Sequence, residues 1–73
     1  MPARLNDIKR ALAALAIAVE EPNKGSHYKA IRADGRKYTI PAHNGGKTMI
    51  GDEYIRGLCR FLEIDIQRFK GLL

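Results

Sequence analysis

The sequence predicts an α+β fold in which two helices lie on one face of a three-stranded antiparallel sheet. Apolar residues recur at helical spacing near both ends of the chain, and residues that favour strands fill the middle. An Asp-Gly turn divides those strands. The predicted order is helix, strand, strand, strand, helix, and then a short helical turn. The 73 residues are expected to form one domain, residues 1–73.

The first helix is predicted by an apolar stripe whose members recur every three or four residues: Leu5, Ile8, Leu12 and Leu15. Asn6 is the candidate N-cap, because an asparagine side chain can accept a hydrogen bond from a free amide at a helix start. The stripe fades near Ala16. Residues 18–21 are then predicted to form a short strand, which Pro22 confines to a strand end or a sheet edge.

Residues 26–33 and 36–42 are predicted to pair as a hairpin around Asp34-Gly35, and two registers fit the pattern. A two-residue loop would place His27 on the same face as Ile31, Tyr38, Ile40 and Ala42. A three-residue loop, 33–35, would instead form the core face from Tyr28, Ala30, Tyr38 and Ile40. It would turn the opposite set toward solvent: His27, Lys29, Lys37 and Thr39. A shift of one residue exchanges the two faces, and we favour the three-residue loop because it buries fewer charges.

The C-terminal third is predicted to be helical. Asp52 is the expected cap of a second helix, whose core positions are Ile55, Leu58 and Leu62. Asp65 is the expected cap of a final turn that presents Ile66, Phe69 and Leu73. The glycine-rich loop that begins at His43 joins the hairpin to this region.

The excess positive charge is confined to the middle of the chain. Residues 24–47 carry six basic side chains and one acidic side chain, Asp34, so their formal charge of +5 equals that of the whole protein. The six are Lys24, Lys29, Arg32, Arg36, Lys37 and Lys47. A local basic patch is typical of a protein that binds a polyanion. His27 lies in the same segment and can exchange a proton near neutral pH, so the pattern indicates RNA chemistry as well as RNA binding.

Several classes of protein do not fit the sequence. The single cysteine, Cys59, cannot form an internal disulfide, and no Cys/His cluster has the spacing of a zinc site. No apolar run approaches the roughly 20 residues that span a membrane, and the N-terminal region lacks the layout of a signal peptide. We therefore expect a cytoplasmic protein that uses no metal or cofactor and does not bind a membrane.

Three motifs, in this order and spacing, resemble the HicA family, the messenger-RNA interferases of HicA–HicB toxin–antitoxin pairs. They are Lys24-Gly25-Ser26-His27, the hairpin turn Asp34-Gly35-Arg36 with the strand 38–43, and the second-helix run 55–60 that leads through 62–65 to Phe69. The resemblance covers essentially the whole chain. The chain departs from the family pattern at Ile17-Ala18, where the family usually has a glycine and an aromatic residue.

The resemblance implies a double-stranded-RNA-binding-like fold and an endoribonuclease that depends on the histidine of the Gly-Ser-His run, here His27. It also implies a HicB-like antitoxin that covers this site, with assembly into a higher-order toxin–antitoxin complex. Messenger RNA would be the substrate. The cleavage would need no metal, so the protein itself must move protons and stabilise the charge of the phosphorane.

The candidate site therefore has one catalytic residue, His27, and a set of residues that contact RNA or phosphate: Lys24, Gly25, Ser26, Lys29, Lys37 and Lys47. His43 is predicted to be an exposed loop histidine, with a catalytic role only if its loop folds back beside His27. Two other classes of function fit the same patch. One is a non-catalytic RNA-binding module, and the other is a regulatory subunit whose basic face binds an acidic protein.

Overall fold

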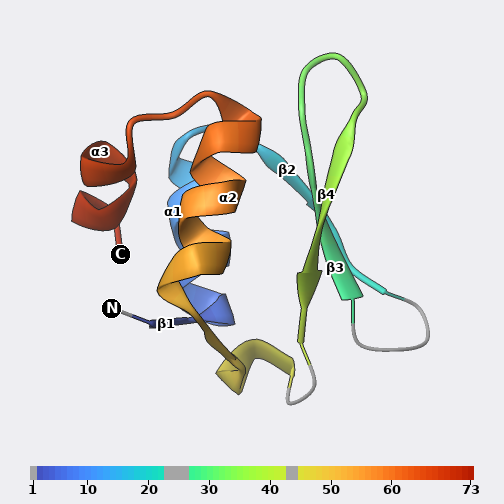
Figure 1. Ribbon diagram of the computed structural model, residues 1–73. Helices are drawn as coiled ribbons and strands as arrows, with labels where there is room; N and C mark the ends of the chain where they lie inside the picture. Colours follow the sequence, from blue (N-terminus) through green and yellow to red (C-terminus); the bar gives the residue numbers. More distant parts are fainter. Residues whose placement is uncertain (1, 23–26, 43–44) are drawn as a thin grey trace.

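Helices and a three-stranded sheet make up most of the structure, a computed structural model that describes residues 2–22, 27–42 and 45–73 (Figure 1). The antiparallel sheet has the strand order β2-β3-β4, with bounds Ala18–Glu20, His27–Ile31 and Lys37–Pro41. Helices α1 (Leu5–Ala14) and α2 (Asp52–Leu62) lie on one face of this sheet. Helix α3 (Ile66–Gly71) lies beyond them, on the side away from the sheet. The predicted α+β class and three-stranded antiparallel sheet are confirmed.

The β3–β4 hairpin has the register of the three-residue loop, as predicted. Tyr28 pairs with Ile40, and Ala30 pairs with Tyr38. In the turn, the Gly35 N–H donates to the Arg32 carbonyl at 3.0 Å. Gly35 has a φ of 89°, a left-handed conformation that glycine adopts without steric cost. The turn therefore sets the loop length, and the loop length decides which side chains face the helices.

The core lies between the inner face of the sheet and the helices. From the sheet, Ala30 and Ile40 are 0% and 1% exposed. The predicted helical stripes supply the other side of the core, with these members buried: Leu5, Ile8, Leu12, Ile55 and Leu58. Phe69 of α3 is also fully buried and belongs to the same cluster.

A second, two-stranded sheet was not predicted. Strand β1 (Ala3–Arg4) pairs with β5 (Met49–Ile50), and a 3₁₀ turn, η1 (Gly45–Lys47), precedes β5. This pairing brings the Thr48 carbonyl to the start of α1, where it accepts a hydrogen bond from the Leu5 N–H at 2.9 Å. A backbone carbonyl thus satisfies one of the free amides at this helix start.

The predicted cap Asn6 is wrong, because α1 begins at Leu5 and its N-cap is Arg4, which makes no side-chain capping bond. The Asn6 side chain instead lies against η1. A Cβ on Gly46 would come within 2.2 Å of Asn6 Oδ1, so any other residue at position 46 would require the Asn6 side chain to shift.

The predicted cap Asp52 is also wrong, because the N-cap of α2 is Gly51 and Asp52 is the first residue of the helix. Its carboxylate binds cations instead: Lys70 Nζ at 2.8 Å and Arg56 Nε at 2.7 Å. Asp65, by contrast, is confirmed as a cap. Its Oδ2 accepts a hydrogen bond from the Arg68 N–H at 3.0 Å at the start of α3.

Candidate nucleic-acid interface

One face of the three-stranded sheet is turned away from α1 and α2 (Figure 1). Paired residues share a face and successive residues alternate, so the register assigns eight residues to this side. They are Ala18, Glu20, His27, Lys29, Ile31, Lys37, Thr39 and Pro41. None of the eight is buried. We call this surface the open face.

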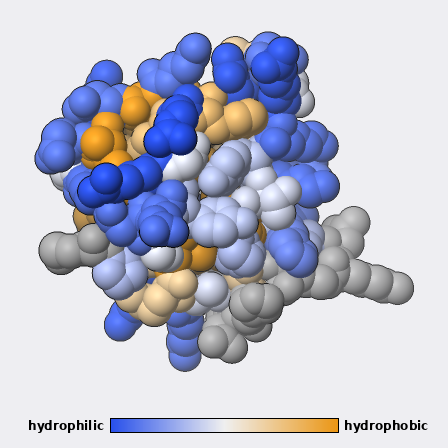
Figure 2. All heavy atoms as spheres, viewed as in Figure 1, coloured by the Kyte–Doolittle hydropathy of each residue, from blue (hydrophilic) through white to orange (hydrophobic). Residues whose placement is uncertain are grey.

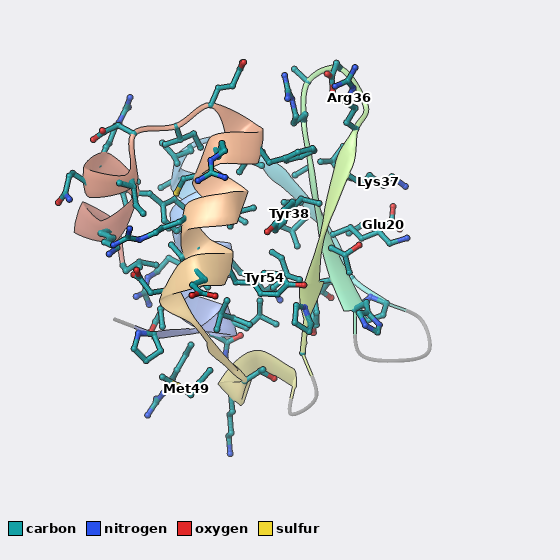
Figure 3. All side chains as sticks on the ribbon, in the orientation of Figure 1. Glu20, Arg36, Lys37, Tyr38, Met49 and Tyr54 are labelled. Carbon is teal, nitrogen blue, oxygen red and sulfur yellow. The ribbon has the colours of Figure 1, made fainter. Side chains whose placement is uncertain are left out.

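Figure 3 shows the two faces of the hairpin side by side. Tyr38 and Tyr54 lie in the space between β4 and α2, whereas Lys37 and Glu20 lie on the other side of β4. The charged side chains of Lys37 and Glu20 thus lie on the face that the helices leave uncovered.

His27 is the first residue of β3 and lies directly opposite Pro41 of β4. Its side chain is exposed. It makes no hydrogen bond or ion pair with another residue in the described part of the chain. The predicted exposure of His27 on the solvent face is therefore confirmed, and a substrate could reach the imidazole from outside the sheet.

Lys29 and Lys37 lie on the same open face, as predicted. Lys29 is two residues from His27 along β3, or roughly 7 Å, and points to the same side. Lys37 of β4 binds Glu20 of β2, with Nζ 2.8 Å from Oε2. Lys29 is the direct cross-strand neighbour of Glu20. The hydrogen bond and charge of Lys37, with a further contribution from Lys29, lower the pKa of the Glu20 carboxyl.

The two arginines of the basic segment lie at the hairpin tip, not on the open face. Arg32 Nη1 donates to the Phe61 carbonyl at 2.9 Å, and its guanidinium also lies 3.6 Å from Glu63 and from Asp34. Arg36 Nε is 3.6 Å from the same Asp34 carboxylate. Figure 2 shows hydrophilic side chains gathered around this end of the hairpin. These arginines therefore contribute to the structure of the tip and to its contact with α2.

The remaining predicted contacts divide into two groups. Lys47 is exposed at the end of η1, outside the three-stranded sheet, so the structure does not bring it onto the open face. Lys24, Gly25, Ser26 and His43 lie outside the described residues. Among the described residues, the candidate interface therefore consists of His27 with Lys29, Lys37, Glu20 and Thr39.

Glu20 is the open-face polar residue that sequence reasoning missed, whereas Thr39 is among the residues that the three-residue loop predicts to face solvent. The signal that could have found Glu20 is the register of β2 against β3. That register makes Glu20 the cross-strand neighbour of Lys29, and Glu20 is the one acidic residue among the eight of the open face. Charge counting by segment hid this, because Glu20 precedes the basic stretch.

The tyrosines of the hairpin belong to the inner face. Tyr38 lies with its ring centroid 5.9 Å from Tyr54 and 5.4 Å from Phe61, and burial raises the pKa of its phenol. Tyr28 lies under the Lys9 ammonium, 5.1 Å from the ring centroid. Both rings are used in packing between the sheet and the helices.

A surface hollow lies away from His27. A hollow of 560 Å³ near the hairpin tip is bordered by the ends of α1 and α2, with Arg32 and Asp34 in its lining. Burial raises the pKa of the Cys59 thiol, which disfavours its reactive thiolate.

Within residues 2–22, 27–42 and 45–73, no group of three His, Cys, Asp or Glu residues is placed to hold a metal ion. No helix of those segments is long and apolar enough to cross a membrane.

No protein-family model matches the chain, and no curated protein or solved structure shows significant similarity to it. The resemblance to HicA therefore stays a prediction that depends on the motifs themselves and on the exposed position of His27.

Proposed function

We propose that this protein is a metal-independent endoribonuclease of the HicA type, a cytoplasmic toxin that cleaves messenger RNA with His27 as its catalytic residue. The observation that carries the proposal is the position of His27, exposed at the start of β3 on the open face, beside Lys29 and on the same side as Lys37. A histidine, a residue type that serves as a general base in catalysis, and two lysines share one accessible surface. The order helix, three strands, helix is compatible with a double-stranded-RNA-binding-like fold.

The proposed reaction uses the RNA's own 2′-hydroxyl as the nucleophile. His27 takes the hydroxyl proton, the oxygen bonds to the adjacent phosphorus, and the bond from phosphorus to the 5′ oxygen breaks. The leaving oxygen takes a proton from water, and the hydroxide that remains takes the proton back from His27. The products are a 2′,3′-cyclic phosphate and a 5′-hydroxyl end. Lys29 would stabilise the negative charge that grows on the phosphorane, and Lys37, farther along the hairpin, would bind the backbone of a neighbouring nucleotide.

The proposal includes a protein partner. A HicB-like antitoxin would neutralise the enzyme by covering the open face, in a complex that can assemble to higher order. Because the cationic groups there are Lys29 and Lys37, the antitoxin surface that covers them is expected to be acidic.

Induction of the protein in a bacterial culture tests this function. The unaltered chain is expected to arrest growth, whereas His27→Gln at equal soluble level is expected to permit normal growth. The matched control is His43→Gln, which removes the other histidine of the chain and should still arrest growth. Arrest by the His27 variant would remove this residue from catalysis, and normal growth with the soluble unaltered protein would remove the toxin function.

Cleavage of purified messenger RNA in the presence of a chelator then tests the chemistry. His27→Gln is expected to slow the cleavage by about 10²–10⁴-fold, the usual contribution of a general base. Loss of all cleavage by the unaltered protein on adding chelator would contradict a metal-independent mechanism.

The alternative is a non-catalytic RNA-binding module, and one observation favours it. No other described residue holds the His27 imidazole in place, whereas a catalytic base is usually oriented by a further group. For such a module, His27→Gln would leave RNA affinity nearly intact, and the unaltered protein would leave RNA uncut. The same binding and cleavage experiments therefore separate the two functions.

A further inference from the structure

The open face holds one strand carboxylate, and it lies among the cations of the proposed interface. Glu20 binds Lys37 through Oε2 at 2.8 Å, and Lys29 is its direct neighbour across the β2–β3 pair. The same two lysines are the ones that we assign to RNA phosphate. An anion of the protein itself therefore sits where an anion of the substrate would bind.

The ion pair runs across the whole sheet. Glu20 is on β2 and Lys37 is on β4, so the pair spans the central strand β3, which carries His27 and Lys29. Adjacent strands are about 4.8 Å apart, and only extended side chains can bridge two such spacings. The ion pair thus lies on the open face, with Lys29 as the cross-strand neighbour of Glu20.

We propose that Glu20 is a resident competitor for RNA phosphate, and that substrate binding displaces its carboxylate from Lys37. This inference depends on the proposed function, because RNA is its ligand. A phosphodiester and a carboxylate are both oxygen anions that accept hydrogen bonds from an ammonium group, so the exchange keeps Lys37 paired throughout. The lysine reaches the substrate at the moment when the glutamate is released.

Such an exchange needs an ion pair that is easily broken, and the Glu20–Lys37 pair has that property. The side chains are 46% and 44% exposed. Exposed pairs of this kind add little to stability, because water screens them and two flexible side chains must be ordered. A substrate phosphate therefore competes against a weak contact, and the competition tunes affinity without blocking binding.

The chain offers a matched control in the next residue. Glu21 carries the same charge, but it pairs with Lys9 of α1, whose ammonium lies over the Tyr28 ring on the inner side of the sheet. Glu20→Gln and Glu21→Gln change the net charge equally. A general electrostatic effect on RNA binding would be the same for both, whereas displacement at Lys37 concerns Glu20 alone.

The test measures affinity for a short single-stranded RNA of mixed sequence, over a range of salt concentrations, with every protein carrying His27→Gln so that no RNA is cut. Glu20→Gln is expected to bind about 1.5-fold to fivefold more tightly than Glu21→Gln. The dependence of log affinity on log salt should be alike for the two variants, because Lys37 reaches the same phosphate in both. Equal affinities for the two variants would overturn the inference.

A lysine variant keeps the test independent of the glutamate. Lys37→Gln should weaken RNA binding and make the salt dependence shallower, whereas Arg68→Gln on α3, away from the sheet, should change both much less. Equal losses for these two would also overturn the inference. If the unaltered site binds no RNA at all, the proposed function fails and takes this inference with it, whereas RNA binding with indistinguishable variants refutes the role of Glu20 alone.

Discussion

The two faces of the three-stranded sheet are built from alternate residues of the same strands, yet they differ in nearly every physical respect. On the inner face, Ala30 and Ile40 are 0% and 1% exposed and pack in the core with the helices. On the open face, the neighbouring residues Lys29 and Thr39 pair with each other in reach of solvent. The backbone is common to both, so the difference comes from the alternation of side chains and from what covers each side.

Within one small sheet, the residues that stabilise the fold and the residues of the candidate site thus lie on opposite faces. The inner face binds the sheet to the helices and carries no charged side chain from the strands. The open face carries the histidine and the lysines, whose removal should leave the core unchanged. Substitutions on the inner face should therefore change the free energy of unfolding, whereas substitutions of charged residues on the open face should change RNA binding.

The largest expected effect comes from Ile40→Ala on the inner face. Removing a fully buried branched side chain costs about 2–5 kcal/mol in the free energy of unfolding, through lost burial and the cavity that remains. Thr39→Ala, its neighbour on the open face, should cost under about 1 kcal/mol. Urea unfolding of both variants measures the two values. Similar losses at the two positions would mean that the faces do not differ in the way described.

A smaller effect on stability is expected from Gly57→Ala in α2, and its sign should depend on the hydroxyl of Tyr38 on the inner face. A Cβ at residue 57 would be 2.6 Å from the Tyr38 hydroxyl oxygen and 3.5 Å from Cζ. The Tyr38 ring lies beside Tyr54 and Phe61, so it cannot move aside freely. Gly57→Ala should therefore destabilise by about 1–3 kcal/mol, although alanine alone would favour the helix by about 1 kcal/mol.

The control for this prediction removes only the clashing oxygen. In a Tyr38→Phe background the contact at 3.5 Å is ordinary, so Gly57→Ala should become neutral or stabilising. Thermal unfolding of the single and double variants gives the coupling between the two residues. A loss of the same size in both backgrounds would show that the hydroxyl is not the cause.

Elements whose signals lie close together in the sequence could be predicted. Asp34-Gly35 located the hairpin turn, and the burial of fewer charges favoured the three-residue loop over the two-residue one, so the exposed position of His27 could be predicted. The helical stripes likewise predicted the buried members of α1 and α2. In each case the deciding residues are within about one turn or one hairpin of each other, where backbone geometry fixes their relation.

Features that depend on distant partners could not be predicted. The β1–β5 pair joins two-residue strands from opposite parts of the chain, too short to show any alternation. Asn6 and Asp52 have the residue types of caps, but Thr48 supplies a carbonyl at one helix start and Lys70 takes the carboxylate near the other. At the candidate site, the Glu20–Lys37 pair joins the two outer strands, so it becomes visible only when the sheet is assembled.

The smallest effects concern two carboxylates whose pKa values are lowered, one in the helical layer and one on the open face. Asp52 receives hydrogen bonds from Lys70 and Arg56, and these lower its pKa below the ordinary value of 3.8. Glu20 is held below its ordinary 4.5 chiefly by Lys37. A carboxyl with a lowered pKa in the folded state stabilises the protein above its ordinary pKa, and this contribution is lost as the pH falls through the folded value.

Asp52→Asn should therefore lower the unfolding temperature at pH 7, and its difference from the unaltered protein should shrink as the pH falls below about 4. Glu20→Gln should show the same trend with a smaller amplitude, because the Asp52 carboxylate binds Arg56 within α2 and Lys70 of α3, whereas Glu20 has one bonded partner on an exposed surface. Thermal unfolding of the two variants between pH 3 and pH 7 measures both trends. A larger effect of Glu20 would mean that the open face contributes to the stability of the fold, and would break the separation between a face that holds the fold together and a face that is free to exchange its partners.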